Sequence, residues 1–226
     1  MVKVKICGIT SVDDALAAVE AGADVLGLNF VGGPRQIGPE QAEEIIRAMP
    51  PFVAVVALVR LEKGRLAREQ HAWLGRQAIR YLQVYGEFEY ADLARLRGEG
   101  FVPLPVLAVG NASFADKAAA WLSTDGPRAM VAIVLDTSDP SRAGGTGRTF
   151  CWDWVTQARQ AGRLADWPPI ILAGGLRPEN VVEAIRAVKP FGVDVSSGVE
   201  KEGQPGSKDP ARMCAFVRNV REAGGT

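Results

Sequence analysis

The sequence predicts one α/β domain, a single (β/α)8 barrel that spans residues 1–226. Eight strand-like stretches alternate with eight helix-like stretches, and neither a linker nor a shift in composition divides the chain. An open, doubly wound sheet is the competing architecture. It would not require eight strands, and no Gly-x-Gly-x-x-Gly motif follows the first strand. The chain is slightly shorter than the roughly 250 residues of a typical barrel, so its loops should be short.

Each predicted strand is a short run rich in apolar residues. The first alternates apolar residues with Lys5 and Cys7 and is broken by Gly8. The third is almost entirely apolar and β-branched, which indicates burial on both faces. The fifth contains Pro103 and Pro105, which cannot donate ladder hydrogen bonds and weaken the strand pattern there. The predicted strands cover residues 3–7, 24–30, 52–59, 79–84, 101–109, 129–135, 169–172 and 192–195.

Capping residues and apolar periodicity place helices between these strands. Thr10 or Ser11 offers an N-cap to the first helix. Pro39 stands in the first turn of the second helix, and three glutamates follow it near the positive end of the helix dipole. The predicted helices cover residues 13–21, 39–49, 63–77, 87–97, 113–122, 152–161, 178–188 and 209–222.

Composition excludes several classes of protein. The chain has 26 Lys and Arg against 26 Asp and Glu and contains no basic run, which argues against a nucleic-acid-binding surface. Cys7, Cys151 and Cys214 are too scattered for a zinc site, and their odd number does not fit a closed set of disulfides. No signal sequence opens the chain, and no apolar run approaches the roughly 20 residues that span a bilayer. We therefore expect a protein of the reducing cytoplasm that binds no membrane.

Polar and reactive side chains follow several of the predicted strands. In a barrel the carboxyl ends of all strands meet at one mouth, where such enzymes keep their chemistry. The fourth strand carries a glutamine, the first, sixth and eighth strands end in or near a candidate residue, and one candidate follows the second strand. The candidates are Cys7, Arg35, Gln83, Asp136 and Asp194. For Cys7 the alternative is a small buried hydrophobic residue, and its position alone does not decide between the two.

Glycine-rich turns follow the last two strands. Gly174-Gly175 and Ser197-Gly198 stand where barrels commonly bind phosphate, because glycine lets backbone N–H groups approach an anion. A short helix from about Gly198 to Glu200 could direct its N-terminus at the same anion. The alternative is that these glycines only form tight turns, and we favour phosphate binding because the two turns are paired. The segment 144–147, Gly-Gly-Thr-Gly, is typical of a loop that covers a ligand.

Two charged candidates have both a structural and a functional interpretation. Asp136 could cap a turn, but a carboxyl at an apolar mouth has a raised pKa, which suits a general acid. Arg35 could form a structural ion pair, but its planar fork also suits a substrate carboxylate. The only histidine, His71, lies inside a predicted helix away from any strand end, so a mechanism based on histidine is disfavoured.

Several motifs in order resemble those of the phosphoribosylanthranilate isomerase family. The first, sixth and eighth strand motifs are specific as a set, and the resemblance covers the whole chain. The motifs are Lys5-Ile6-Cys7-Gly8-Ile9-Thr10, Gly27-Leu28-Asn29-Phe30 with Pro34-Arg35, Leu135-Asp136 with residues 144–150, Leu172-Ala173-Gly174-Gly175-Leu176, Gly192 to Glu200, and Gly206-Ser207-Lys208-Asp209.

The resemblance implies an Amadori rearrangement of N-(5-phosphoribosyl)anthranilate in tryptophan biosynthesis. It implies that Cys7 is the general base, that Asp136 is the general acid, and that Arg35 holds the anthranilate carboxylate. Gln83 and Asp194 would contact the substrate, Asp194 beside the sugar. The turns at Gly174-Gly175 and Ser197-Gly198 would bind its phosphate. The resemblance implies no metal and no organic cofactor, a small phosphorylated sugar–anthranilate as the only ligand, and either a monomer or a homodimer.

Three positions depart from the usual family pattern. Tyr85 stands where the family commonly has histidine, Gly33 where it has serine, and Cys151 where it has aspartate. None of these departures removes the expected acid, base or anion-binding groups.

Two other functions remain open from the sequence. A related barrel isomerase of histidine biosynthesis performs the same rearrangement, but it usually has aspartate where Cys7 stands and shows a half-barrel repeat, which we do not find. A non-catalytic barrel that binds a sugar phosphate would need neither Cys7 nor Asp136.

Lys5 is the candidate for activating Cys7. Side chains two residues apart on a strand share a face, so Lys5 should lie on the same side as Cys7, one layer deeper. Its ammonium group would favour the thiolate and lower the thiol pKa. Alternatively, Lys5 pairs with a carboxylate of the barrel such as that of Asp194, and the two roles are compatible.

Overall fold

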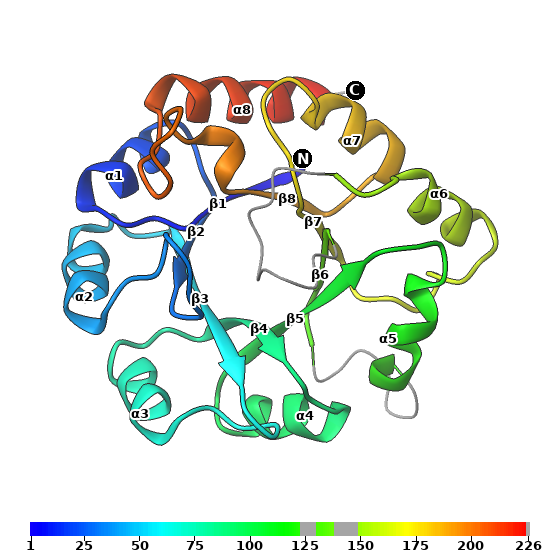
Figure 1. The fold of residues 1–226 in the computed structure, drawn as a ribbon, viewed down its shortest axis with the longest axis horizontal. Coiled ribbons are helices and arrows are strands. Elements are labelled where there is room, and N and C mark those ends of the chain that lie inside the picture. The colour runs from blue at the N-terminus through cyan, green and yellow to red at the C-terminus, as the bar shows by residue number, and fades with distance from the viewer. Residues whose placement is uncertain (123–129, 138–148, 225–226) are drawn as a thin grey trace.

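The described residues form a closed barrel of eight parallel strands surrounded by helices, a (β/α)8 or TIM barrel (Figure 1). The computed structural model describes residues 1–122, 130–137 and 149–224. The strands pair in the order of the sequence, and β8 closes the barrel by pairing with β1. The predicted fold class is therefore confirmed. The predicted ligand-covering loop at 144–147 lies outside the described residues.

The strands line the centre of the molecule, and their carboxyl ends open on one side. Their bounds are β1 Lys3–Cys7, β2 Val25–Asn29, β3 Ala54–Leu61, β4 Tyr81–Gly86, β5 Val102–Val109, β6 Ile133–Thr137, β7 Ile170–Leu172 and β8 Gly192–Val195. The register places Lys5 opposite Val25 of β2 on one side and opposite Asp194 of β8 on the other. This pairing brings the two ends of the sequence into one site.

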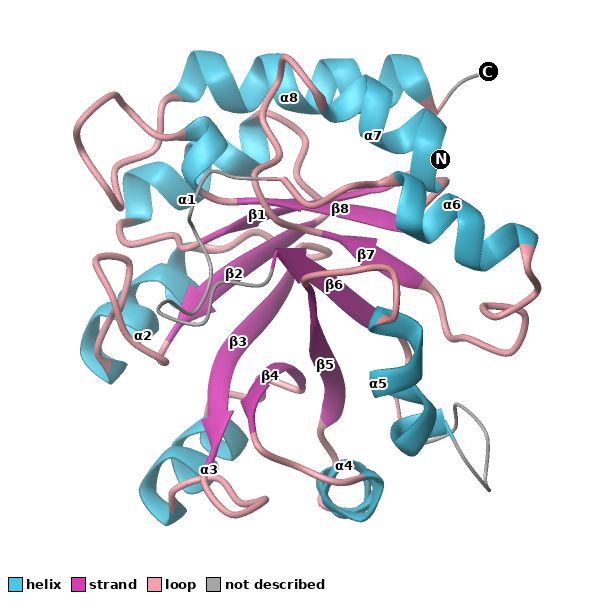
Figure 2. Ribbon diagram, turned by 45° about the vertical axis from the view of Figure 1, so that its right-hand side comes forward, coloured by secondary structure: helices cyan, strands magenta, loops and turns pink. Residues whose placement is uncertain are grey.

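The helices form the outer layer (Figure 2). Their bounds are α1 Val12–Glu20, α2 Pro39–Ala48, α3 Arg68–Arg76, α4 Tyr90–Gly98, α5 Phe114–Leu122, α6 Asp153–Gln160, α7 Val181–Val188 and α8 Pro210–Ala223, with a short 3-10 helix, η2, at Ser197–Val199. In α7 the buried residues Val181, Ala184, Ile185 and Val188 recur at helical spacing and face the sheet. No helix in these parts of the chain is long and apolar enough to cross a membrane.

Alternation along the strands divides the core in two. Val56 and Leu58 of β3 pack with Cys7 in a small cluster inside the barrel, whereas Ala57 and Val59 belong to the large core between strands and helices. Successive side chains of a strand point to opposite faces, so both faces of this strand are buried. The prediction for the third strand is confirmed.

The two prolines of β5 are compatible with a strand because of where its pairing begins. Val102 donates its N–H to the Arg80 carbonyl of the β4 side at 2.7 Å. N–H groups alternate in direction along a strand, so the positions of Pro103 and Pro105 face the β6 side. The ladder with β6 begins only at Val106, beyond both prolines. The missing donors therefore leave no gap in the sheet.

One predicted helix begins later than expected. The prediction places it at residues 63–77, but α3 begins at Arg68. Glu62 and Arg65 exchange backbone hydrogen bonds around a tight turn in which Lys63 and Gly64 have positive φ angles of 49° and 74°. A helix cannot start through left-handed residues, so the turn delays it.

Candidate active site

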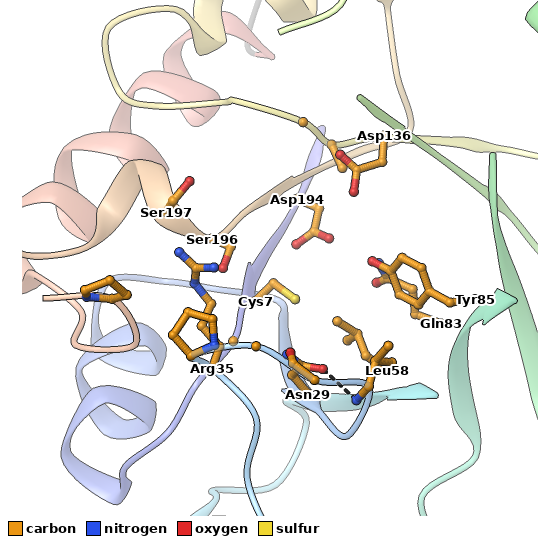
Figure 3. A pocket seen from close by; sticks show the side chains of 18 of the residues that line it. Cys7, Asn29, Arg35, Leu58, Gln83, Tyr85, Asp136, Asp194, Ser196 and Ser197 are labelled. Atoms are coloured by element: carbon orange, nitrogen blue, oxygen red, sulfur yellow. Dashed lines mark hydrogen bonds between the residues drawn. The ribbon is translucent and has the colours of Figure 1, made fainter. Parts of the chain in front are cut away.

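A cavity of about 580 Å³ opens at the carboxyl ends of the strands (Figure 3). Most of the residues predicted from the sequence meet there, although the strands that carry them lie far apart in the chain. The predicted residues that line it are Cys7, Arg35, Gln83, Asp136, Gly174, Gly175, Asp194 and Ser197. Lys5 and Gly198 do not line the cavity. Each contacts a residue that does: Lys5 binds Asp194, and Gly198 packs against Leu176.

Cys7 is the last residue of β1, and its thiol lies at the floor of the cavity with 6% of the residue exposed. Gly27 of β2 pairs with it in the sheet. A Cβ atom at Gly27 would lie 2.7 Å from the Cys7 Sγ atom, closer than two such atoms can approach. Gly27 therefore leaves the space that the thiol occupies, a role that sequence reasoning missed.

Lys5 pairs with Asp194 beneath the cavity, as one of the two sequence-based interpretations expects. Its Nζ atom donates to the Asp194 Oδ2 atom at 2.6 Å, and the two residues are only 5% and 7% exposed. Burial works against the ammonium form, but Asp194 and Cys7 together raise the pKa of Lys5, so it stays charged. The other oxygen of Asp194, Oδ1, is buried and has no hydrogen-bond partner among the described residues.

The net direction of the Cys7 pKa corrects one expectation. Burial raises the pKa of the Cys7 thiol above its usual value, and this effect outweighs the opposite effect of Lys5. Lys5 thus favours the thiolate, as predicted, but it does not make the resting thiol acidic. The sequence does not reveal how deeply the end of β1 is buried.

Replacing Lys5 by Met is expected to raise the Cys7 pKa further, because the positive charge that does most to favour the thiolate is lost. The measurement is the pH dependence of Cys7 alkylation by iodoacetamide. Cys151 and Cys214, both exposed, are replaced by Ser in both proteins to remove their reaction. An unchanged alkylation curve would show that Lys5 does not influence the thiol.

Asp136 lies near the end of β6 and faces the cavity. Burial raises its pKa to about 6, although the Thr137 N–H donates to Oδ1 at 2.7 Å and favours the charged form. The predicted upward shift is confirmed. A Cβ atom at Gly174 would lie 2.3 Å from Thr137 Oγ1 and 3.0 Å from Asp136 Oδ1, so glycine is needed where β7 ends beside this carboxyl.

Arg35 lies at the rim of the cavity and is held by a residue that sequence reasoning did not single out. Its Nε and Nη2 atoms donate to the two carboxylate oxygens of Glu200 at 2.6 and 2.7 Å. Lys208, completely buried, donates to Glu200 Oε1 at 3.0 Å. The structural ion pair considered for Arg35 is therefore present, on an arginine that also lines the cavity.

Gln83 and Tyr85 of β4 lie side by side on the wall of the cavity across from Arg35 (Figure 3). Gln83 donates from Nε2 to the Tyr85 hydroxyl oxygen at 2.9 Å, and its Oε1 atom is buried without a partner among the described residues. Burial raises the pKa of Tyr85 well above its usual value, so the phenol stays neutral.

The two glycine turns adopt the conformations that glycine favours, and they pack against each other. Gly174 and Gly175 have φ angles of 85° and 63°. Ser197 begins the 3-10 helix η2 and lines the cavity, whereas Gly198 lies behind it. A Cβ atom at Gly198 would lie 1.9 Å from the Leu176 carbonyl oxygen, so this glycine allows the turn after β8 to contact the turn after β7.

His71 lies on α3, away from the cavity, as expected. Its Nε2 atom is 3.0 Å from Glu99 Oε2, and its ring packs edge-on against Phe101. Both contacts are on the outer layer of the barrel, so the histidine has no part in the site.

The fold and the site together place the chain among the (β/α)8-barrel enzymes, with a thiol and two carboxyl groups lining the cavity at the carboxyl mouth of the barrel. The model of the PRAI family, N-(5'-phosphoribosyl)anthranilate (PRA) isomerase, matches residues 4–219. The chain belongs to this family of isomerases of tryptophan biosynthesis, and the resemblance seen in its motifs is confirmed.

Curated relatives match the chain along its whole length. The N-(5'-phosphoribosyl)anthranilate isomerase of Trichlorobacter lovleyi is 41% identical over 226 residues, which cover 99% of this chain and 100% of the relative. That of Geotalea uraniireducens is 40% identical over 222 residues and covers 98% and 99%.

Solved structures of the family have the same fold. Phosphoribosyl anthranilate isomerase from Thermotoga maritima is 35% identical and has a TM-score of 0.82, with 98% of this chain and 100% of that chain covered. A phosphoribosyl anthranilate isomerase in complex with reduced 1-(o-carboxyphenylamino)-1-deoxyribulose 5-phosphate is 31% identical and has a TM-score of 0.79, with the same coverage.

Proposed function

We propose that this chain converts N-(5-phosphoribosyl)anthranilate to 1-(2-carboxyphenylamino)-1-deoxyribulose 5-phosphate by an Amadori rearrangement, with Cys7 as base and Asp136 as acid. The observation that carries the proposal is the meeting of a thiol and a carboxyl of raised pKa in one cavity of a chain that belongs to this family. The two groups come from strands β1 and β6, so they can act on different atoms of one bound sugar.

The steps balance without a further reactant. Protonated Asp136 gives its proton to the furanose ring oxygen as the bond between that oxygen and C1 breaks, and the anthranilate nitrogen supplies the electron pair for the new C1=N bond. Cys7, as the thiolate, takes the proton from C2, and the electron pair left behind forms the C1=C2 bond of an enol amine while the π electrons of the C1=N bond return to the nitrogen. A proton added at C1 and the loss of the enol O–H proton give the ketone.

The other residues of the cavity support a placement of the substrate. Gly174, Gly175 and Ser197 lie where barrels commonly bind phosphate, and Arg35 offers a charged donor for the anthranilate carboxylate. Gln83 Oε1 and Asp194 Oδ1, which have no partner within the described part of the chain, can accept hydrogen bonds from sugar hydroxyl groups. We expect no cofactor, and we expect a monomer or a homodimer. The T. maritima relative is described as a dimeric isomerase.

The decisive experiment generates phosphoribosylanthranilate in the assay and follows its consumption by fluorescence. We expect consumption that depends on Cys7. The absence of consumption by the folded protein would refute the proposed reaction. Binding of the substrate without consumption would instead favour a sugar-phosphate-binding protein.

Replacing Arg35 by Ala is expected to raise the Michaelis constant more than it changes kcat. A lost charge-assisted contact with a carboxylate costs roughly 1.5–3 kcal/mol, or about 10- to 150-fold in affinity. Lys at this position should restore only part of the loss, because it lacks the planar fork. Arg218→Ala, on the exposed side of α8, serves as the control. An unchanged Michaelis constant in Arg35→Ala would count against this placement of the substrate.

Replacing Tyr85 by Phe is expected to leave most of the turnover. The neutral phenol has a pKa too high for a base near pH 7, so the position should transfer no proton. Tyr81→Phe, at the opposite end of the same strand, is the matched control. A tenfold or larger loss in Tyr85→Phe alone would show that the hydroxyl group takes part.

A further inference from the structure

Three charged side chains form a connected cluster behind the rim of the cavity: Arg35, Glu200 and Lys208. Glu200 Oε1 accepts from Arg35 Nε at 2.6 Å, from Lys208 Nζ at 3.0 Å and from the Gly206 N–H at 3.1 Å. Its Oε2 atom accepts from Arg35 Nη2 at 2.7 Å. The Glu200 carboxylate therefore accepts hydrogen bonds from three residues, Arg35, Lys208 and Gly206, and these bonds fix its orientation.

Glu200 occupies only one edge of the Arg35 guanidinium. A guanidinium carries five N–H groups in a planar fork and can bind one carboxylate through Nε and Nη2 and a second through Nη1 and Nη2. Among the described residues, Nη1 has no hydrogen-bond partner, and Arg35 lines the cavity. The edge formed by Nη1 and Nη2 is thus available to a ligand.

Lys208 balances the charge that this arrangement needs. Arg35 and Glu200 alone would be neutral, and a bound carboxylate would leave an excess negative charge in a partly buried place, which is unfavourable. The ammonium group of Lys208 makes the cluster cationic before binding and neutral after it. Lys208 also donates to the Ser196 carbonyl at 3.2 Å, next to the turn that carries Ser197.

We propose that Glu200 is a positioning residue for the substrate carboxylate: it holds Arg35 by the Nε–Nη2 edge, so that the other edge faces the ligand, and Lys208 in turn holds Glu200. The proposal rests on the proposed function, because it takes the ligand to be the anthranilate carboxylate. Gly8 contributes to the same geometry, since a Cβ atom there would lie 2.6 Å from Arg35 Cδ.

The test compares two ligands that differ only in the carboxylate. One is reduced 1-(o-carboxyphenylamino)-1-deoxyribulose 5-phosphate, and the other is its counterpart made with aniline. In Glu200→Gln the amide NH2 group must face at least one of the donors that Glu200 accepts from, so Arg35 loses its fixed position. We expect affinity for the first ligand to fall at least about tenfold and affinity for the second to change less than about twofold.

The direction in which Glu200→Gln changes affinity for the carboxylate ligand distinguishes a positioning role of Glu200 from a purely electrostatic one. If Glu200 acted only as a negative charge near the site, its removal would strengthen binding of the carboxylate ligand. Tighter or equal binding in Glu200→Gln therefore overturns the proposal. Glu200→Asp keeps the charge but shortens the reach, so it should also lose selectivity for the carboxylate ligand, and unchanged selectivity in this variant overturns the proposal as well.

Two controls exclude a general loss of structure. Glu99→Gln removes an exposed carboxylate that binds Arg95 on α4, and it should leave both affinities unchanged. Thermal unfolding shows whether each variant is folded. If folded Glu200→Gln keeps the turnover and the ligand selectivity of the wild type, the positioning role is overturned and the proposed function remains intact. Failure of the wild type to distinguish the two ligands overturns the carboxylate contact of Arg35 and with it the positioning role, whereas the proposed reaction is refuted only if the folded wild type consumes no substrate.

Discussion

Cys7→Ser is expected to lower kcat at least about 10²-fold, as the loss of a positioned proton-transfer group does. Serine fits the space that Gly27 leaves for the thiol, so the variant should fold normally. A serine hydroxyl is a far weaker acid than a thiol, and its anion is not formed at the pH of the assay. The measurement is steady-state turnover of generated phosphoribosylanthranilate, with circular dichroism to establish folding.

Cys214→Ser is the matched control, because Cys214 is an exposed cysteine on α8. It should keep full turnover. Near-normal turnover in Cys7→Ser would show that another group removes the C2 proton.

Asp136→Asn is expected to cause a loss of at least about 10²-fold as well, because the amide keeps the shape of the side chain but cannot give a proton to the ring oxygen. Its pH profile offers a second readout. The pKa of Asp136 is about 6, and the pKa of Cys7 is raised above its usual value by burial. The acid is therefore deprotonated at a lower pH than the base.

The sign of the pH dependence follows from this order. Below pH 6 Asp136 is protonated, and kcat/KM rises with pH because the thiolate population rises. Between the two pKa values the gain in thiolate is offset by the loss of protonated Asp136, so the profile is flat, and above the pKa of Cys7 it falls. In Asp136→Asn the change of slope near pH 6 should vanish. A wild-type profile without that change, or an Asp136→Asn variant with normal turnover, would contradict the assignment of the acid.

Local sequence patterns predicted the strand ends well. The eighth strand was expected at residues 192–195 and is found at Gly192–Val195, because a short β-branched stretch that begins at a glycine and is followed by two serines has clear limits. Asp136 could be located because it follows an apolar run, and Cys7 because it ends an alternating strand that Gly8 breaks. Since strand ends converge in a barrel, their meeting in one cavity followed from the fold class alone.

Long-range contacts account for what the sequence could not predict. Glu200, the partner of Arg35, lies 165 residues away in a segment that no local pattern connects with it. Gly27 reads as an ordinary glycine within a strand until its register with Cys7 is known. The raised pKa of Cys7 depends on burial by several strands at once, which no motif reveals.

The pairing of β1 with β8 has a consequence for how the chain folds. The Lys5–Asp194 contact joins residues 189 positions apart. Closing so long a loop lowers the conformational entropy of the chain before the contacts between β1 and β8 can stabilise it. Every other neighbouring pair of strands can form as the chain elongates, but this seam needs both the first and the last strand. Because Cys7 lies on one side of the seam and Asp194 on the other, these two residues of the cavity come together only when β1 pairs with β8. We therefore expect turnover, after dilution from denaturant, to recover no faster than this seam forms.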